Sequence, residues 1–430
     1  MPIIGAVKVL IVSFYFPPAG GVGVQRALKF AAQLPDLGIE THVLAPDDPR
    51  WLHRDEELQP PASVRVHRAR YLGPRGRRPA EELRQVKGGR RLARRLQLFA
   101  RRLIVPDENA TWLLTAVPAA IKIVRQEQID VVLTTSPPGS VHLVGAAVKR
   151  ATGIPWVADL RDPLAAHPHR DVDRLVVRLK DRAQGVIARV VSQRADAIVA
   201  VSDAIAEEMR RLEPRGQIVP IANGCDFDDF AGLEHIPRQP FRFTHTGSFF
   251  GKRDPRPFLS ALAQVDDVVA RFVGDFRSVD REWAESLGLS DRIELIPYLS
   301  HRRALDLQRD SEALVLLIPH AGGRGEGILS GKVFEYIAAE RPILALVPPA
   351  GAAARLLTET GVGVVVDPDD VHAIKAAIVA MRDGEPAGSC SSLTPHWRGI
   401  LSRRARVEEL AALLRSLSKR EWIGDDSASI

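Results

Sequence analysis

The sequence predicts an α/β protein made of two facing Rossmann-like domains, each a parallel sheet covered by helices. Short β-branched or apolar runs alternate with helical patterns along the whole chain, as in parallel, doubly wound sheets. The alternation forms two successive series of six or seven strands, which favours two sheets over one. A length of 430 residues also exceeds what one hydrophobic core usually holds.

The first domain is expected over residues 1–232 and the second over 241–385, with Pro237 and Pro240 marking the break. In the first domain we expect strands at 8–16, 41–45, 64–69, 130–136, 155–160, 197–202 and 218–223, and helices at 22–37, 111–127, 140–151 and 172–194. In the second we expect strands at 241–247, 268–274, 292–298, 313–319, 342–348 and 363–367. A last helix around 398–418, within 396–420, is expected to cross back to the first domain before a disordered tail at 421–430.

The composition, with 45% hydrophobic and 26% charged residues, is that of an ordinary globular protein. The two cysteines, Cys225 and Cys390, lie far apart, which excludes a disulfide scaffold and a cysteine zinc site and favours a reducing compartment. No apolar run approaches the roughly 20 residues that span a bilayer, and the apolar N-terminal run lacks the basic start of a signal peptide. We therefore expect a cytoplasmic protein.

Positive charge is concentrated in residues 65–102, which hold fourteen Lys or Arg and two acids, a local net charge of +12 in a chain of +6. We expect a basic helical segment at 74–103, in which 84–103 interleaves apolar residues with arginines at roughly helical spacing. Such a helix either lies on an anionic membrane surface at the inner face of the membrane or packs on its own domain. No nucleic acid partner is expected, because no zinc-finger, RNA-recognition or helix-turn-helix motif accompanies the charge.

Ligands of open α/β sheets bind at the carboxyl ends of the strands, so the loops there are the candidates, and we expect the site between the two domains. In the glycine-rich turn 17–26, Gly21 and Gly23 are candidates for binding the donor diphosphate, because they allow a ligand to approach a helix start, or they merely tighten the turn. Arg26 stands where a dinucleotide-binding motif needs a third glycine, so an NAD enzyme is not favoured.

Three polar residues after the fourth and fifth strands are our catalytic candidates. His142 falls in the first turns of a helix, where it either contacts a ligand or has a structural role. Arg161 and Asp162 lie at the carboxyl end of a strand, where packing does not require them. Alternatively, these two residues pair with each other or cap the helix at 172–194.

The second half contains two candidate phosphate loops. Gly247 gives a turn followed by Lys252 and Arg253, a plausible diphosphate cradle unless these are ordinary surface cations. Ser330 begins a helix whose free N–H groups, together with Lys332, suit a phosphate. Glu335, one turn later, would repel phosphate and instead suits ribose hydroxyls, unless Lys332 and Glu335 form an exposed ion pair. No metal site emerges, since Asp226, Asp228 and Asp229 are interpreted as loop and capping residues.

Together these segments resemble glycosyltransferase family 4, the retaining nucleotide-sugar transferases of the GT-B fold. The matching segments follow in the right order over nearly the whole chain: FPPAGGVGVQR, then 135–163, 195–209, 221–226, 245–255 and 330–344. The resemblance implies that the second domain binds a nucleotide-diphosphate sugar as co-substrate, with no cofactor. It also implies a glycan or lipid-linked acceptor on the first domain, and metal-independent catalysis in which the leaving diphosphate deprotonates the acceptor.

The chain departs from the family pattern at several positions. The family has two glutamates eight positions apart, but Gly327 stands eight residues before Glu335, with Glu326 beside it. We keep Glu326 and Gly327 as candidates for contacts with the donor sugar. Ser248 replaces a common arginine, and Glu340 replaces a common glycine. Two other functions stay open: a nucleotide-sugar 2-epimerase of the same fold, and a non-catalytic nucleotide-sugar-binding protein.

Overall fold

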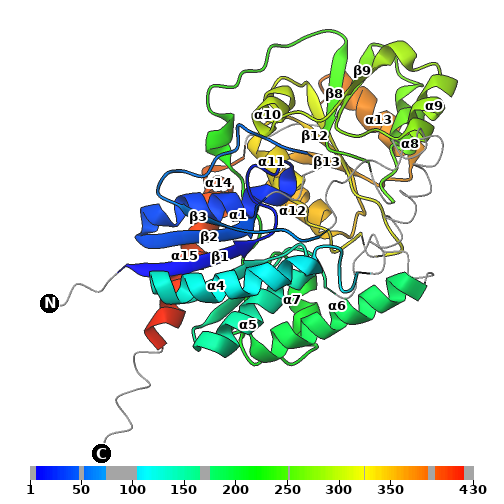
Figure 1. The fold of residues 1–430 in the computed structure, drawn as a ribbon. Coiled ribbons are helices and arrows are strands. Elements are labelled where there is room, and N and C mark those ends of the chain that lie inside the picture. The colour runs from blue at the N-terminus through cyan, green and yellow to red at the C-terminus, as the bar shows by residue number, and fades with distance from the viewer. Residues whose placement is uncertain are drawn as a thin grey trace, which may run out of the picture. The chain divides into compact units, whose positions relative to one another are not determined.

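The computed structural model describes residues 6–47, 53–73, 104–164, 175–249, 252–323, 325–385 and 393–420. Their contacts divide the chain into two compact units (Figure 1). Unit 1 comprises Met1–Ala222 and Arg406–Ile430, and unit 2 comprises Asn223–Ala405. The first transition between units therefore falls before the proline-flanked stretch 230–241 at which the sequence places the domain boundary.

Unit 1 is built on a seven-stranded sheet of order β3-β2-β1-β4-β5-β6-β7, in which all neighbouring strands pair in parallel. The strands are β1 (Val7–Ser13), β2 (Ile39–Pro46), β3 (Arg65–Ala69), β4 (Val131–Thr135), β5 (Trp156–Leu160), β6 (Ala197–Ala200) and β7 (Gln217–Pro220). The helices are α1 (Val22–Gln33), α4 (Leu113–Glu127), α5 (His142–Thr152), α6 (Leu175–Arg194), α7 (Asp203–Arg210) and α15 (Arg403–Arg420).

Alternate residues of these strands enter two hydrophobic cores, because successive side chains point to opposite faces of a sheet. Leu10 and Val12 join a core with α4, α5, α6 and α7, whereas Val9 and Ile11 join a core with α1 and α15. Figure 1 shows α4, α5 and α6 as one layer over the sheet. The C-terminal helix α15 thus packs on the sheet of unit 1.

Unit 2 is built on a six-stranded sheet of order β10-β9-β8-β11-β12-β13, also with parallel pairings. The strands are β8 (Phe241–Thr246), β9 (Val268–Val273), β10 (Ile293–Ile296), β11 (Ala313–Leu317), β12 (Ile343–Leu346) and β13 (Gly363–Val366). The helices are α8 (Arg256–Leu262), α9 (Ser278–Ser286), α10 (His301–Arg309), α11 (Gly331–Ala338), α12 (Ala352–Thr360), α13 (Val371–Arg382) and α14 (Pro395–Leu401). Both sheets reverse their strand order at one point, between β1 and β4 and between β8 and β11.

The predicted fold class is confirmed: both sheets are parallel and flanked by helices, and a strand lies in each predicted strand range. The last helix differs from the prediction, because Ser402 adopts an extended conformation that separates α14 from α15. The basic segment 74–103 and the tail 421–430 lie outside the described residues. Among the helices of the described ranges, none is long and apolar enough to cross a membrane.

Candidate functional site

The candidate donor site of unit 2 lies at the carboxyl ends of β8 and β11, where the strand order reverses. Gly247 directly follows β8, and α11, which carries Lys332 and Glu335, follows β11. Ligands of open α/β sheets bind at this kind of switch point, outside the carboxyl ends of the strands. The topology therefore brings together the two phosphate loops that the sequence indicated separately.

Lys332 is buried against the backbone of Gly247. Its side chain is only 9% exposed, and a Cβ added to Gly247 would lie 1.6 Å from the Lys332 Nζ. Gly247 has φ +128°, a conformation that L side chains rarely adopt, so a glycine is needed here for two reasons. Burial lowers the pKa of Lys332 well below its ordinary value, the positive charge of Arg253 lowers it further, and Glu335 opposes this effect.

Arg253 adds a second cation to this loop. Its Nη1 donates to the carbonyl of Ser248 at 3.2 Å, and burial lowers the pKa of its guanidinium. Within the described residues, Lys332 Nζ has no hydrogen bond or ion pair. One of these two neighbouring cations is buried without a counter-ion, and a diphosphate bound here would neutralise both positive charges.

The carboxylate of Glu335 is held by two side chains of α10 and does not form an ion pair with Lys332 among the described contacts. His301 Nε2 lies 3.3 Å from Glu335 Oε2, and Gln308 Nε2 donates to Glu335 Oε1. Burial alone would raise the pKa of Glu335, but the hydrogen bonds with His301 and Gln308 and the charge of Lys332 hold it below its ordinary value. The exposed ion pair considered from the sequence is therefore absent, and Glu335 is an oriented carboxylate.

Tyr336 fixes α11 to the end of β8. Its hydroxyl accepts the backbone N–H of Thr246 at 2.8 Å, and Gln308 Nε2 donates to the Thr246 hydroxyl at 2.9 Å. Burial raises the pKa of Tyr336 to about 12, so the hydroxyl stays neutral. These contacts fix the position of Glu335 relative to the start of the Gly247 loop.

The other predicted donor residues are more loosely placed. Ser330 occupies the N-cap position of α11, and its hydroxyl makes no capping bond. Lys252 and Glu326 are exposed, and Gly327 is half-buried. The Glu326 carbonyl accepts from the N–H of Ala352 at 2.7 Å, so its backbone is part of the loop framework.

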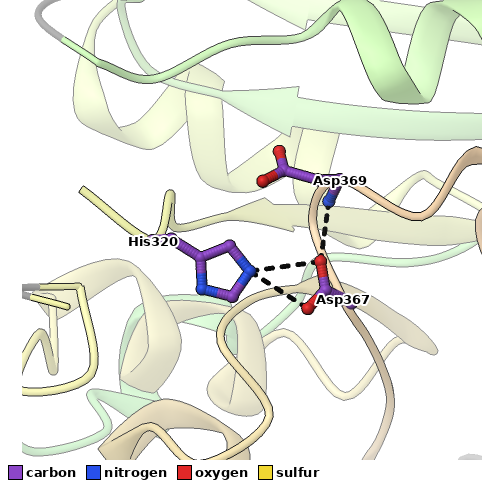
Figure 2. Close-up of side chains that lie close together, drawn as sticks. All are labelled: His320, Asp367 and Asp369. Atoms are coloured by element: carbon purple, nitrogen blue, oxygen red, sulfur yellow. Dashed lines mark hydrogen bonds and ion pairs between the residues drawn. The ribbon is translucent and has the colours of Figure 1, made fainter. Parts of the chain in front are cut away.

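His320, Asp367 and Asp369 form a further polar cluster at the ends of β11 and β13 (Figure 2). Their ligand atoms lie within 4.8 Å of one another, a spacing compatible with a cation. However, His320 Nε2 already lies 3.0 and 3.1 Å from the two Asp367 oxygens, and one of these also accepts the Asp369 N–H at 3.0 Å. Since Asp367 is occupied by these partners, we assign the cluster to linking two loops.

Unit 1 has a pocket of about 370 Å³ at the switch point between β1 and β4. Its walls include Tyr15 after β1, residues 136–139 after β4 and Asp162 after β5. Asp162 is half-buried, and among the described residues its carboxylate has no hydrogen-bond or ion-pair partner. Arg161 is not among the residues that line this pocket, and its Nη1 donates to the carbonyl of Gly23 at 2.7 Å.

A buried ion pair between Arg26 and Asp159 anchors the end of the glycine-rich turn 17–26. Arg26 contacts both carboxylate oxygens of Asp159 at 2.8–3.1 Å, and the hydroxyl of Thr135 donates to the same carboxylate at 2.7 Å. Gly21 has φ +91° and begins α1. Arg26, which departs from the dinucleotide motif, is therefore a structural residue of this unit.

His142, the third catalytic candidate, is fully buried. Its Nδ1 lies 2.8 Å from the Thr134 hydroxyl, which also accepts from Trp156 Nε1 at 2.8 Å. Burial lowers the pKa of His142 to about 4, so the ring is neutral at ordinary pH. His142 does not line the pocket in this structure, and its contacts are those of a structural histidine.

The polar residues of unit 2 that the sequence analysis missed include His301, Gln308, Thr246 and Tyr336. Gln308 and His301 lie on a helix whose spacing resembles that of any surface helix. In the sequence, Tyr336 occupies what looks like an ordinary apolar position of a helix. His320 and Asp367 could have been found, because each follows a strand at its carboxyl end.

The fold is that of the GT-B glycosyltransferases. Residues 20–224 match the family model described as "Glycosyl transferase 4-like domain", which agrees with the family that the motifs indicated. A curated relative, "Probable glycosyltransferase WbjE" of Pseudomonas aeruginosa, is 26% identical over 321 residues, 68% of this chain and 76% of its own length.

Solved structures share the fold across nearly the whole chain. Sucrose-phosphate synthase from Thermosynechococcus elongatus superposes with a TM-score of 0.71 at 14% identity, over 96% of this chain and 99% of its own. HepE of Anabaena, solved with UDP and glucose, superposes with a TM-score of 0.64 at 16% identity, over 95% and 100% of the two chains. At these identities the likeness establishes the fold.

Proposed function

We propose that the protein transfers a sugar from a UDP-sugar to a hydroxyl of a glycan or lipid-linked acceptor, with retention and without a metal. The observation that carries this proposal is the buried, unpartnered ammonium of Lys332 over Gly247, beside Arg253. The structure of HepE with UDP and glucose supports the choice of UDP.

In this mechanism the two cations and the α11 start bind the diphosphate, and Glu335 accepts hydrogen bonds from the ribose hydroxyls. The bond between the anomeric carbon and the phosphate oxygen breaks, and the diphosphate leaves with its electron pair. The acceptor oxygen attacks on the same face and forms the new glycosidic bond, while its proton passes to the leaving phosphate oxygen. The cations stabilise the charge that develops on the diphosphate.

The donor assignment is tested by thermal shift with UDP, GDP and ADP and with their sugar derivatives, each with and without EDTA. We expect UDP to raise the melting temperature with no effect of EDTA, because a ligand that binds the folded state stabilises it by mass action. A shift that requires a divalent cation would instead implicate a metal, with His320, Asp367 and Asp369 as the first residues to test.

Two alternatives predict different products from UDP-sugar alone. A 2-epimerase would convert UDP-N-acetylglucosamine to its C2 epimer without an acceptor, and NMR would detect this conversion. A non-catalytic binding protein would be stabilised by UDP-sugars yet release no UDP, even with membrane-extracted glycolipids. Release of UDP that depends on such an extract would support the transferase.

A further inference from the structure

Gln308 of α10 is a fully buried glutamine that contacts the carboxylate of Glu335. Its Nε2 donates to the Thr246 hydroxyl at 2.9 Å and to Glu335 Oε1. An amide nitrogen has two N–H groups, so these two contacts use both of them. Gln308 therefore links the end of β8, the helix α10 and the first turns of α11.

The orientation of this amide is determined by Glu335. If the amide were turned by 180°, its oxygen would face a carboxylate, which only accepts hydrogen bonds, so Nε2 must face Glu335. This orientation leaves Gln308 Oε1 buried without a hydrogen-bond partner in the described part of the chain. Burial of an unpartnered acceptor is unfavourable. Packing therefore does not explain a glutamine at this position, whereas its contact with Glu335 does.

His301 contacts the other oxygen of the same carboxylate. His301 and Gln308 are seven residues apart, or two turns, so they lie on one face of α10, beside α11 (Figure 1). His301 Nε2 lies 3.3 Å from Glu335 Oε2 and carries the proton, because two acceptors would not form this contact. Each oxygen of Glu335 thus receives one hydrogen bond from α10.

The acceptor sites of Glu335 that remain match a pair of neighbouring hydroxyls. A carboxylate has about four lone-pair sites, and the two donors of α10 take one on each oxygen. One further site remains on each oxygen, so two adjacent hydroxyls of one ring can donate at the same time. The Glu335 side chain is 15% exposed and can be reached by a ligand. Gln308 is enclosed and acts only through Glu335.

The groups around Glu335 keep it ionised. Burial raises its pKa, but the hydrogen bonds from His301 and Gln308 and the charges of His301 and Lys332 lower it by more. Tyr336, the next residue of α11, is neutral because burial raises its pKa to about 12. An ionised carboxylate accepts stronger hydrogen bonds from hydroxyls than a protonated one does.

We propose that Gln308 and His301 are positioning residues that make Glu335 a bidentate acceptor for a cis-diol, so that the donor site selects ribonucleotides over deoxyribonucleotides. This inference rests on the proposed transferase function, in which Lys332 and Arg253 bind the diphosphate. Those two cations attract the phosphates of either kind of nucleotide equally. Selection between the two kinds therefore depends on Glu335 and on the side chains that orient it.

Calorimetric titration with UDP and with 2′-deoxy-UDP tests this role through the ratio of the two dissociation constants. The wild type should bind UDP at least about tenfold more tightly, because the 2′-hydroxyl donates to an ionised carboxylate. In Gln308→Met this preference should shrink at least about threefold, because Glu335 loses a hydrogen bond that orients it. A purely structural residue would weaken the binding of both nucleotides alike and leave the ratio unchanged.

The pH dependence of the same ratio is a second measurement. Without the N–H of Gln308, burial raises the pKa of Glu335 with less opposition. The preference for UDP is present above this pKa and is lost as the pH falls through it. The loss should therefore occur about one pH unit higher in Gln308→Met than in the wild type. Since both nucleotides carry the same diphosphate, its own titration cancels in the ratio.

Two further variants complete the test. His301→Ala removes the other donor and should also shrink the preference, which keeps the test valid if Gln308→Met does not fold. Gln264→Met is the control, at an exposed glutamine of unit 2 whose Nε2 donates to the Ser260 carbonyl at 3.0 Å, and it should keep the wild-type ratio.

The outcomes separate this inference from the proposed function. A wild-type ratio in both α10 variants would overturn the positioning role, and so would a wild type that binds UDP and 2′-deoxy-UDP equally well. In either case binding of UDP itself would still support the donor site. A wild type that binds neither nucleotide would refute the proposed donor and this inference together.

Discussion

The substitution Lys332→Met separates a nucleotide-binding lysine from a structural one. In the ligand-free protein an unpartnered buried ammonium is unfavourable, so its replacement by an apolar side chain of similar length should stabilise unit 2 by about 1–3 kcal/mol. In a unit of about 180 residues, 1 kcal/mol corresponds to a shift in melting temperature of about 2–4 °C. We therefore expect the variant to melt several degrees above the wild type.

With UDP the stability difference between the variant and the wild type should narrow. At a concentration of 100 times Kd, UDP stabilises the wild type by about 2.7 kcal/mol. Loss of a charge-assisted contact with phosphate, about 2 kcal/mol, weakens affinity about thirtyfold. The same UDP concentration then stabilises the variant by only about 0.9 kcal/mol.

Differential scanning fluorimetry with and without UDP, supported by calorimetric titration, measures both effects. Lys375→Met, at a surface lysine of α13 whose Nζ contacts Gln264 at 3.4 Å, is the matched control and should change neither quantity. A lower melting temperature of ligand-free Lys332→Met would mean that Lys332 is a structural residue. An unchanged UDP affinity would refute its contact with the diphosphate.

Two further predictions follow from the buried groups. Gly247→Ala should weaken UDP binding at least about tenfold, because the new Cβ would displace the Lys332 ammonium. Gly288→Ala, also at positive φ but with open space around it, is the control and should leave the UDP affinity measured by calorimetry unchanged. Equal UDP affinities of Gly247→Ala and the wild type would contradict this account. The pKa of His142 is lowered to about 4 in the folded state, so the unfolded chain binds the proton more tightly and stability falls as pH drops from about 6.5 towards 4, by up to about 3 kcal/mol. Urea unfolding at pH 7 and pH 4.5 should show this loss, which His142→Gln should reduce; the same loss in the variant would rule out His142 as its source.

Much of the fold was predictable because its determinants are local. Parallel strands buried on both faces appear in the sequence as short apolar runs, and helices appear as apolar residues at helical spacing. A strand therefore lies in each predicted strand range. The single C-terminal helix was not predicted correctly, because the break at Ser402 involves a bridge to Cys225, which is distant in sequence. Similarly, Glu340 holds a positive φ at the end of α11 with Arg309 and Arg398 as ion-pair partners, contacts that no local pattern announces.

The sequence by itself determined the two-sheet architecture and located the loops that we propose to bind phosphate, because glycine turns, helix starts and cations are local features. Only the tertiary structure decided what each side chain does there. It buried Lys332 against Gly247, turned Glu335 towards His301 and Gln308, enclosed His142 and left Asp162 facing a pocket. Burial and partners depend on chain segments tens of residues apart, and these contacts determine which charges remain available for a ligand.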